Sequence, residues 1–61
     1  MLSEYRKYAE DRVNSCKLRL RIMESSQERH VRLHGSPSEE FERQIQLLNQ
    51  SIQKWEDVLK L

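Results

Sequence analysis

Two histidines spaced four residues apart are the residues best placed for metal chemistry. His30 and His34 would fall on one side of a helix, which is the spacing that helical zinc-binding pairs use. A zinc site needs further ligands, and Cys16 lies more than three helical turns away. We therefore expect no metal site, and we interpret the two histidines as helix-end residues whose positive charge suits the helix dipole.

Cys16 and a cluster of carboxylates are the other candidates for catalysis. Cys16 falls on the apolar stripe of the first predicted helix, so we expect a buried core residue rather than a nucleophile. As the single cysteine of the chain, it also excludes an intramolecular disulfide. Glu39, Glu40 and Glu42 begin the second predicted helix, where the helix dipole favours acidic side chains. We therefore predict a protein that is not an enzyme and needs no cofactor.

Basic residues in the first half of the chain raise the alternative of nucleic-acid binding. They are Arg12, Lys17, Arg19 and Arg21. On a helix these residues spread over much of the circumference, and no aromatic residue lies between them to stack on bases. The net charge of +1 is also small for such a function, so nucleic acid is an unlikely partner. The alternative hypothesis is a small dimeric nucleic-acid-binding regulator, whose affinity would fall steeply with salt.

Composition predicts that long helices position these residues. The 61 residues are 34% charged and include one glycine and one proline, which is typical of long helices. Gly35 stands where the first helix would end. The segment Ser36-Pro37-Ser38-Glu39 predicts a capping box, with Ser36 as the N-cap of the second helix and Pro37 as its first helical residue. So short a connection makes the two helices antiparallel neighbours.

The predicted fold is therefore all-α, an antiparallel two-helix hairpin that forms a single domain over residues 1–61. We expect the first helix over about 3–33, the turn over about 34–36 and the second helix over about 37–60. Residues 1–35 carry eight Lys/Arg against five Asp/Glu, and residues 36–61 carry three against five. The two halves thus complement each other in charge, which favours their folding together.

The spacing of apolar residues predicts which sides of the helices meet. In the second helix they recur at alternating intervals of four and three residues, the pattern of a helix that packs along another helix. The first helix carries a matching stripe. The predicted hairpin core consists of Val13, Cys16, Leu20, Met23, Phe41, Ile45, Leu48, Ile52, Trp55 and Leu59.

A second set of apolar residues lies away from this seam. On the first helix it falls on roughly the opposite side, and on the second helix it falls on one flank. A hairpin has one interface and cannot bury both sets, so the second set predicts a further partner. We expect self-association into a homodimeric four-helix bundle or docking on a helical partner protein. The candidate interface consists of Tyr8, Leu18, Ile22, Leu33, Leu47 and Val58.

These patterns together predict a non-enzymatic protein–protein interaction module, such as a small adaptor, co-chaperone or regulatory subunit. No run approaches the roughly 18 apolar residues of a membrane span, so we expect no membrane partner. Reducing conditions suit a lone cysteine, and no signal peptide is visible, so we expect a cytoplasmic protein.

Two short segments resemble those of known helical-hairpin families. Residues 48–54 resemble the Ser-Gln-Glu-Leu-Asp motif of small sporulation aspartyl-phosphate phosphatases. The acidic residue that this family needs falls at Gln53, an amide, so the resemblance implies the hairpin without the phosphatase activity. Residues 35–41, a glycine turn followed by Glu-Glu-aromatic, are similar to the small hairpin co-chaperones of type III secretion needle subunits. This second resemblance implies a hairpin that binds another protein.

Overall fold

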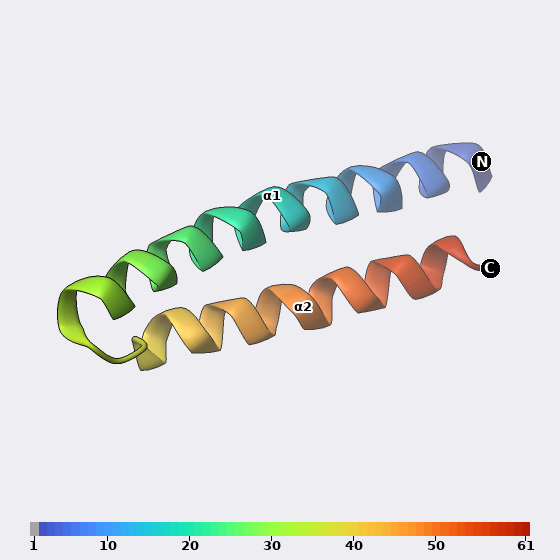
Figure 1. Cartoon of the computed structure of the whole chain (residues 1–61). Coiled ribbons are helices and arrows are strands. Elements are labelled where there is room, and N and C mark those ends of the chain that lie inside the picture. Colours follow the sequence, from blue (N-terminus) through green and yellow to red (C-terminus); the bar gives the residue numbers. More distant parts are fainter. Residues whose placement is uncertain (1) are drawn as a thin grey trace.

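The computed structural model describes residues 2–61 and shows an all-helical hairpin. Helix α1 spans Leu2–His34 and helix α2 spans Glu39–Leu59, and the two run antiparallel side by side (Figure 1). The molecule is a rod with extents of 49 × 14 × 13 Å. Both chain ends lie at one end of the rod and the linker lies at the other (Figure 1). The predicted all-α hairpin is confirmed.

Helix α1 ends where the sequence predicts, at the only glycine. Gly35 has a φ of +78°, a left-handed conformation that side chains with a Cβ adopt at a cost. Its N–H donates to the carbonyl oxygen of Val31 over 2.8 Å, which is the single bond of an αL helix end. The chain therefore leaves the α1 axis abruptly at Gly35 and turns toward α2.

The start of α2 differs from the prediction. The N-cap is Ser38, not Ser36: its backbone is extended and its hydroxyl accepts a hydrogen bond from the N–H of Phe41. Pro37 consequently lies in the linker and is not the first helical residue. Phe41, rather than a glutamate, stands three residues after the cap, so no reciprocal capping box forms. Helix α2 thus begins at Glu39 and not at residue 37.

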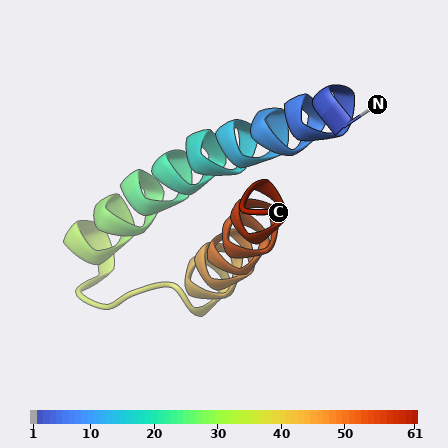
Figure 2. The ribbon, with the colours of Figure 1, turned by 90° about the vertical axis from the view of Figure 1, so that its right-hand side faces the viewer.

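A contact with α1 explains why Ser38 is the cap. The Ser38 N–H donates to Gln27 Oε1 over 2.8 Å, and Gln27 Nε2 donates to the Ser38 carbonyl oxygen over 3.0 Å. Both bonds hold Ser38 in the extended conformation that an N-cap residue needs. Gln27 lies seven residues before the end of α1, so about two turns of α1 extend past the start of α2. The linker spans this overhang (Figure 2).

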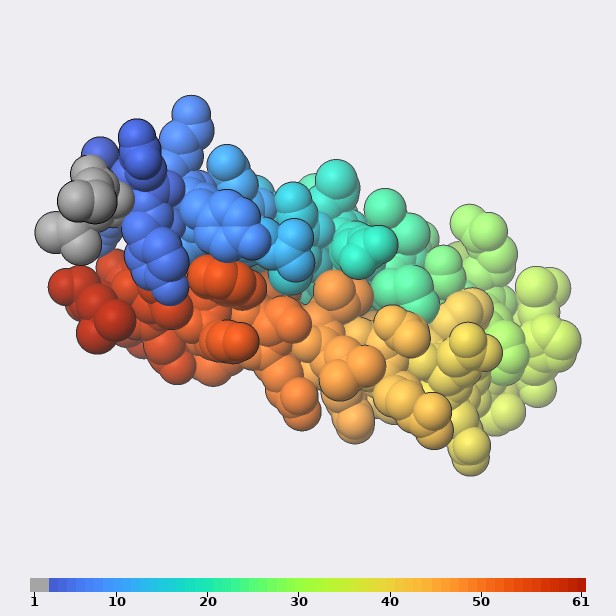
Figure 3. Space-filling model, turned by 180° about the vertical axis from the view of Figure 1, so that it is seen from behind, coloured from blue at the N-terminus to red at the C-terminus, as the bar shows by residue number. Residues whose placement is uncertain are grey.

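The core is a narrow line of small and medium side chains between the two helices. Ala9, Val13, Cys16 and Ile52 are buried. The other predicted core residues are half-buried: Leu20, Met23, Phe41, Ile45, Leu48, Trp55 and Leu59. In the space-filling view the two helices form the two edges of one rod (Figure 3). A pair of helices offers no second layer, so even the central residues keep part of their surface in contact with solvent.

Candidate protein-binding surface

Four aliphatic side chains of the interface predicted from the sequence leave half or more of their surface in solvent, although each is as apolar as the core residues. They are Leu18, Ile22 and Leu33 on α1 and Leu47 on α2, with exposed fractions of 60%, 57%, 74% and 50%. We call them the outer apolar residues. Their exposure leaves apolar surface that the hairpin itself does not cover.

The other two predicted interface residues lie closer to the seam. The Tyr8 ring contacts the Trp55 ring edge to face, with centroids 5.5 Å apart, yet Tyr8 remains 54% exposed. Val58 is half-buried and lines a hollow near the chain ends together with Tyr5 and Leu59. Tyr8 and Val58 therefore border the hairpin core, and Tyr8 still keeps about as much of its surface in solvent as Leu47 does.

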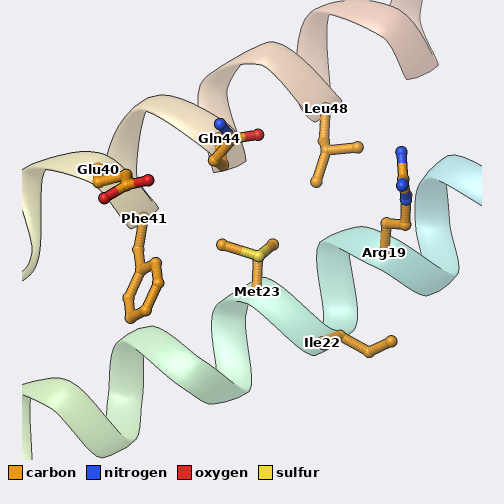
Figure 4. A pocket seen from close by; sticks show the side chains of 7 residues that line it. All are labelled: Arg19, Ile22, Met23, Glu40, Phe41, Gln44 and Leu48. Atoms are coloured by element: carbon orange, nitrogen blue, oxygen red, sulfur yellow. The ribbon is translucent and has the colours of Figure 1, made fainter.

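A groove of about 370 Å³ runs between the helices beside one outer apolar residue. Met23 of α1 and Phe41 and Leu48 of α2 project into it (Figure 4). Ile22 lies on the outer side of α1, at the groove's margin, and the groove is also lined by Arg19, Glu40 and Gln44 (Figure 4). Its floor is apolar and its rim is polar, which is the composition of surfaces that bind protein side chains.

The two long edges of the hairpin seam differ in chemistry. One edge is closed by polar contacts between the helices. These are Lys17 Nζ to Glu56 Oε2 at 3.6 Å, Arg6 to the carbonyl oxygen of Leu59 at 3.0 Å, and Gln27 to Glu42 at 3.3 Å. The other edge carries the Tyr8–Trp55 contact and the groove. We call it the groove edge, and it is where the seam is left open.

Leu47 lies on the groove edge as well. Glu40, Gln44 and Leu47 follow at intervals of four and three residues and so share one side of α2. Glu40 and Gln44 line the groove, as does Ile22 from α1. Ile22 of α1 and Leu47 of α2 therefore flank the same open edge of the hairpin, whereas Leu18 lies farther around α1 and points away from α2.

The histidine pair belongs to the linker end of the molecule. The His30 and His34 rings lie 4.4 Å apart, and His30 Nδ1 is 2.9 Å from the carbonyl oxygen of Ser36. The His30 ring also meets the Phe41 ring edge to face at 5.9 Å. Within residues 2–61, the structure contains no group of three or more His, Cys, Asp or Glu residues placed to hold a metal ion. The observed contacts instead attach the linker and the start of α2 to α1.

The basic residues of α1 do not gather on one side. At about 100° per residue, Lys17 and Arg19 point about 160° apart around the helix. Lys17 pairs with Glu56 across the seam, whereas Arg19 lines the groove. Arg12 and Arg21 are exposed. The surface thus presents separate cations rather than one basic stripe.

Sequence prediction missed a set of polar residues that share a side of α1 with Leu18 and Ile22. Asp11, Ser15 and Arg29 are among them, and all are exposed. The available signal was their spacing, which continues the intervals of three and four residues from Leu18 and Ile22 in both directions.

Comparison of the chain with protein-family models, with curated proteins and with solved structures gives no match to any of them. In the part of the chain that the structure describes, neither helix is both long and apolar enough to cross a membrane.

Proposed function

We propose that the chain is a protein–protein interaction module without catalytic activity, which binds other helices through its outer apolar residues. The observation that carries the proposal is the exposure of Leu18 and Ile22, which lie one turn apart on α1 and point away from the hairpin core. Contiguous exposed apolar patches that are larger than a monomer normally exposes mark interaction sites.

The total surface supports the same proposal. A compact monomeric protein of 7.4 kDa exposes about 4,200 Å² of accessible surface. This hairpin exposes 5212 Å². The excess of about 1,000 Å² is comparable to the roughly 800 Å² that each partner buries in a protein–protein interface of standard size. Association would therefore give the chain the compactness that a single hairpin lacks.

The proposed assemblies are a homodimeric four-helix bundle and a complex with the helices of another protein. Both would cover the side of α1 that carries Leu18 and Ile22, because these are adjacent aliphatic side chains that the hairpin leaves in solvent. In either assembly the chain would act as an adaptor, a co-chaperone or a regulatory subunit, roles that consist of binding alone.

Site-specific photo-cross-linking in cells that make this protein tests the proposal. A benzophenone amino acid would replace Leu18, at the proposed contact surface, or Asn49 as the control. Asn49 is exposed and lies about 160° around α2 from Leu47. We expect irradiation to give a covalent adduct of defined mass at position 18 and none at position 49.

The identity of the adduct separates the two assemblies. An adduct of two copies of the chain indicates self-association, and an adduct with a different protein indicates a heteromeric complex. Either adduct supports an interaction module. If position 18 gives no more adduct than position 49, Leu18 does not contact a protein and the proposed function is wrong.

A further inference from the structure

One side of α1 carries a heptad pattern that is separate from the hairpin seam. Its residues follow at alternating intervals of three and four, and all are exposed: Tyr8, Asp11, Ser15, Leu18, Ile22, Ser25, Arg29 and Arg32. We call them the second stripe. Alternating intervals of three and four along one helix are the pattern of a second coiled-coil contact. Helix α1 therefore has a contact surface for α2 and another for a further helix.

The order of residues along the second stripe is symmetric about residue 20. Leu18 and Ile22 are apolar and lie at equal distances on either side of it. Farther out, Asp11 on one side is matched by Arg29 on the other. Ser15 is likewise matched by Ser25. Such an order is complementary to itself when two copies of the helix run antiparallel, because each residue then faces its match.

We propose that the partner of this surface is a second copy of the chain, packed with α1 antiparallel to α1 about a two-fold axis at residue 20. This inference rests on the proposed function and names its partner. Leu18 of one copy faces Ile22 of the other, and Asp11 faces Arg29, so each contact occurs twice. The small Ser15 and Ser25 side chains face each other and let the helix backbones approach closely.

The charges on this surface are available for such contacts. Among residues 2–61 the ion pairs within the chain are Lys17–Glu56 and Lys60–Asp57. Neither pair uses Asp11 or Arg29. The excess surface of about 1,000 Å² per chain also matches what each partner contributes to a stable dimer. Area and charge complementarity therefore both favour a second copy.

Disulfide trapping tests the position of the axis. In a Cys16→Ala background, the double variant Ser15→Cys/Ser25→Cys places the thiol at position 15 of each copy against the thiol at position 25 of the other. The control, Leu33→Cys, places a thiol 13 residues from the axis, so its copy lies about 39 Å away along the rod. A disulfide needs Cα atoms within about 7 Å. We expect mild oxidation to link Ser15→Cys/Ser25→Cys into dimers and to leave Leu33→Cys unlinked.

A charge exchange tests the same arrangement without introducing cysteines. Asp11→Arg places like charges against Arg29 of the second copy at two points of the dimer. We expect it to raise the dimer dissociation constant about tenfold or more. Arg29→Asp should act in the same way, and the double variant Asp11→Arg/Arg29→Asp should restore dimerisation because every pair becomes opposite in sign again. Circular dichroism on each variant shows that the helices are retained.

The outcomes separate this inference from the proposed function. A single-chain mass at all concentrations overturns the dimer, while an adduct with another protein at position 18 would still support the interaction module. Cross-linking at position 33 would indicate parallel helices and overturn the antiparallel axis. Failure of the double charge variant to restore dimerisation would also overturn the proposed pairing of Asp11 with Arg29.

Discussion

Gln27 is the residue that fixes how the two helices meet at the linker end. Its side-chain amide bonds both backbone groups of Ser38, donating to the carbonyl oxygen and accepting from the N–H. The same Nε2 lies 3.3 Å from Glu42 Oε2. One side chain on α1 therefore sets the backbone conformation of the N-cap residue of α2.

Replacing Gln27 should weaken the hairpin more than its surface position suggests. Gln27→Ala removes two half-buried hydrogen bonds, each worth about 1 kcal/mol net, and leaves the Ser38 N–H without its partner. We expect a loss of about 2 kcal/mol in the free energy of unfolding, measured by urea denaturation at fixed protein concentration.

Gln46→Ala is the matched control, because Gln46 is exposed and makes no hydrogen bond through its side chain within residues 2–61. It should change the free energy of unfolding by no more than about 0.5 kcal/mol. Equal effects of Gln27→Ala and Gln46→Ala would show that the Gln27 contact does not stabilise the hairpin.

At the scale of the helices, the sequence predicts the hairpin well because the signals are local. Gly35 ends α1 where expected, and the intervals of four and three identify the sides that meet. These features depend on residues close together in the chain. The outer apolar residues follow from the same periodicity, since a side chain that is not on the seam must lie elsewhere on the helix.

The start of α2 could not be predicted in this way. Ser36 and Ser38 are both acceptable caps, and Ser36 has the better local motif because Glu39 follows it by three residues. The choice is made by Gln27, eleven residues before Ser38, through a tertiary contact that has no local sequence signal. The Lys17–Glu56 ion pair could not be predicted either, because the residues of α2 that lie beside Lys17 depend on where α2 begins.

Alanine substitutions can decide between the two serines. Ser38→Ala removes the hydroxyl that accepts from the Phe41 N–H, so it should lower the free energy of unfolding by about 1 kcal/mol. Ser36→Ala should have an effect within about 0.5 kcal/mol, because Ser36 contacts His30 through its backbone carbonyl and not through its hydroxyl. Urea titrations of both variants measure the difference. A larger loss for Ser36→Ala would place the cap at Ser36 after all.

At the scale of the whole molecule, the hairpin has a thin core and a large surface. Two helices leave most core residues half-buried, and the groove edge exposes apolar side chains on both α1 and α2. Chains of about 60 residues have small cores and are often stabilised by association. The thin core and the exposed apolar side chains limit the stability of the isolated hairpin, and the same two features suit it to pack against further helices in a larger bundle.

Stability should therefore depend on protein concentration. If two chains unfold together, the melting temperature rises as the concentration rises, because mass action favours the dimer. Thermal melts followed by circular dichroism over a hundredfold range of concentration would measure this dependence. A melting temperature that does not change over that range would indicate that each hairpin unfolds alone.

The mass of the chain in solution, measured by light scattering at low and high micromolar concentration, tests the central claim most directly. The samples are the native chain, Leu18→Lys/Ile22→Lys, and the control Gln46→Lys/Asn49→Lys, which adds the same charge about 100° or more around α2 from Leu47. Native chain and control should have about twice the 7.4 kDa mass of one chain. The Leu18→Lys/Ile22→Lys variant should have the mass of one chain and remain largely helical. Equal masses for all three samples would contradict the claim that Leu18 and Ile22 form a protein interface.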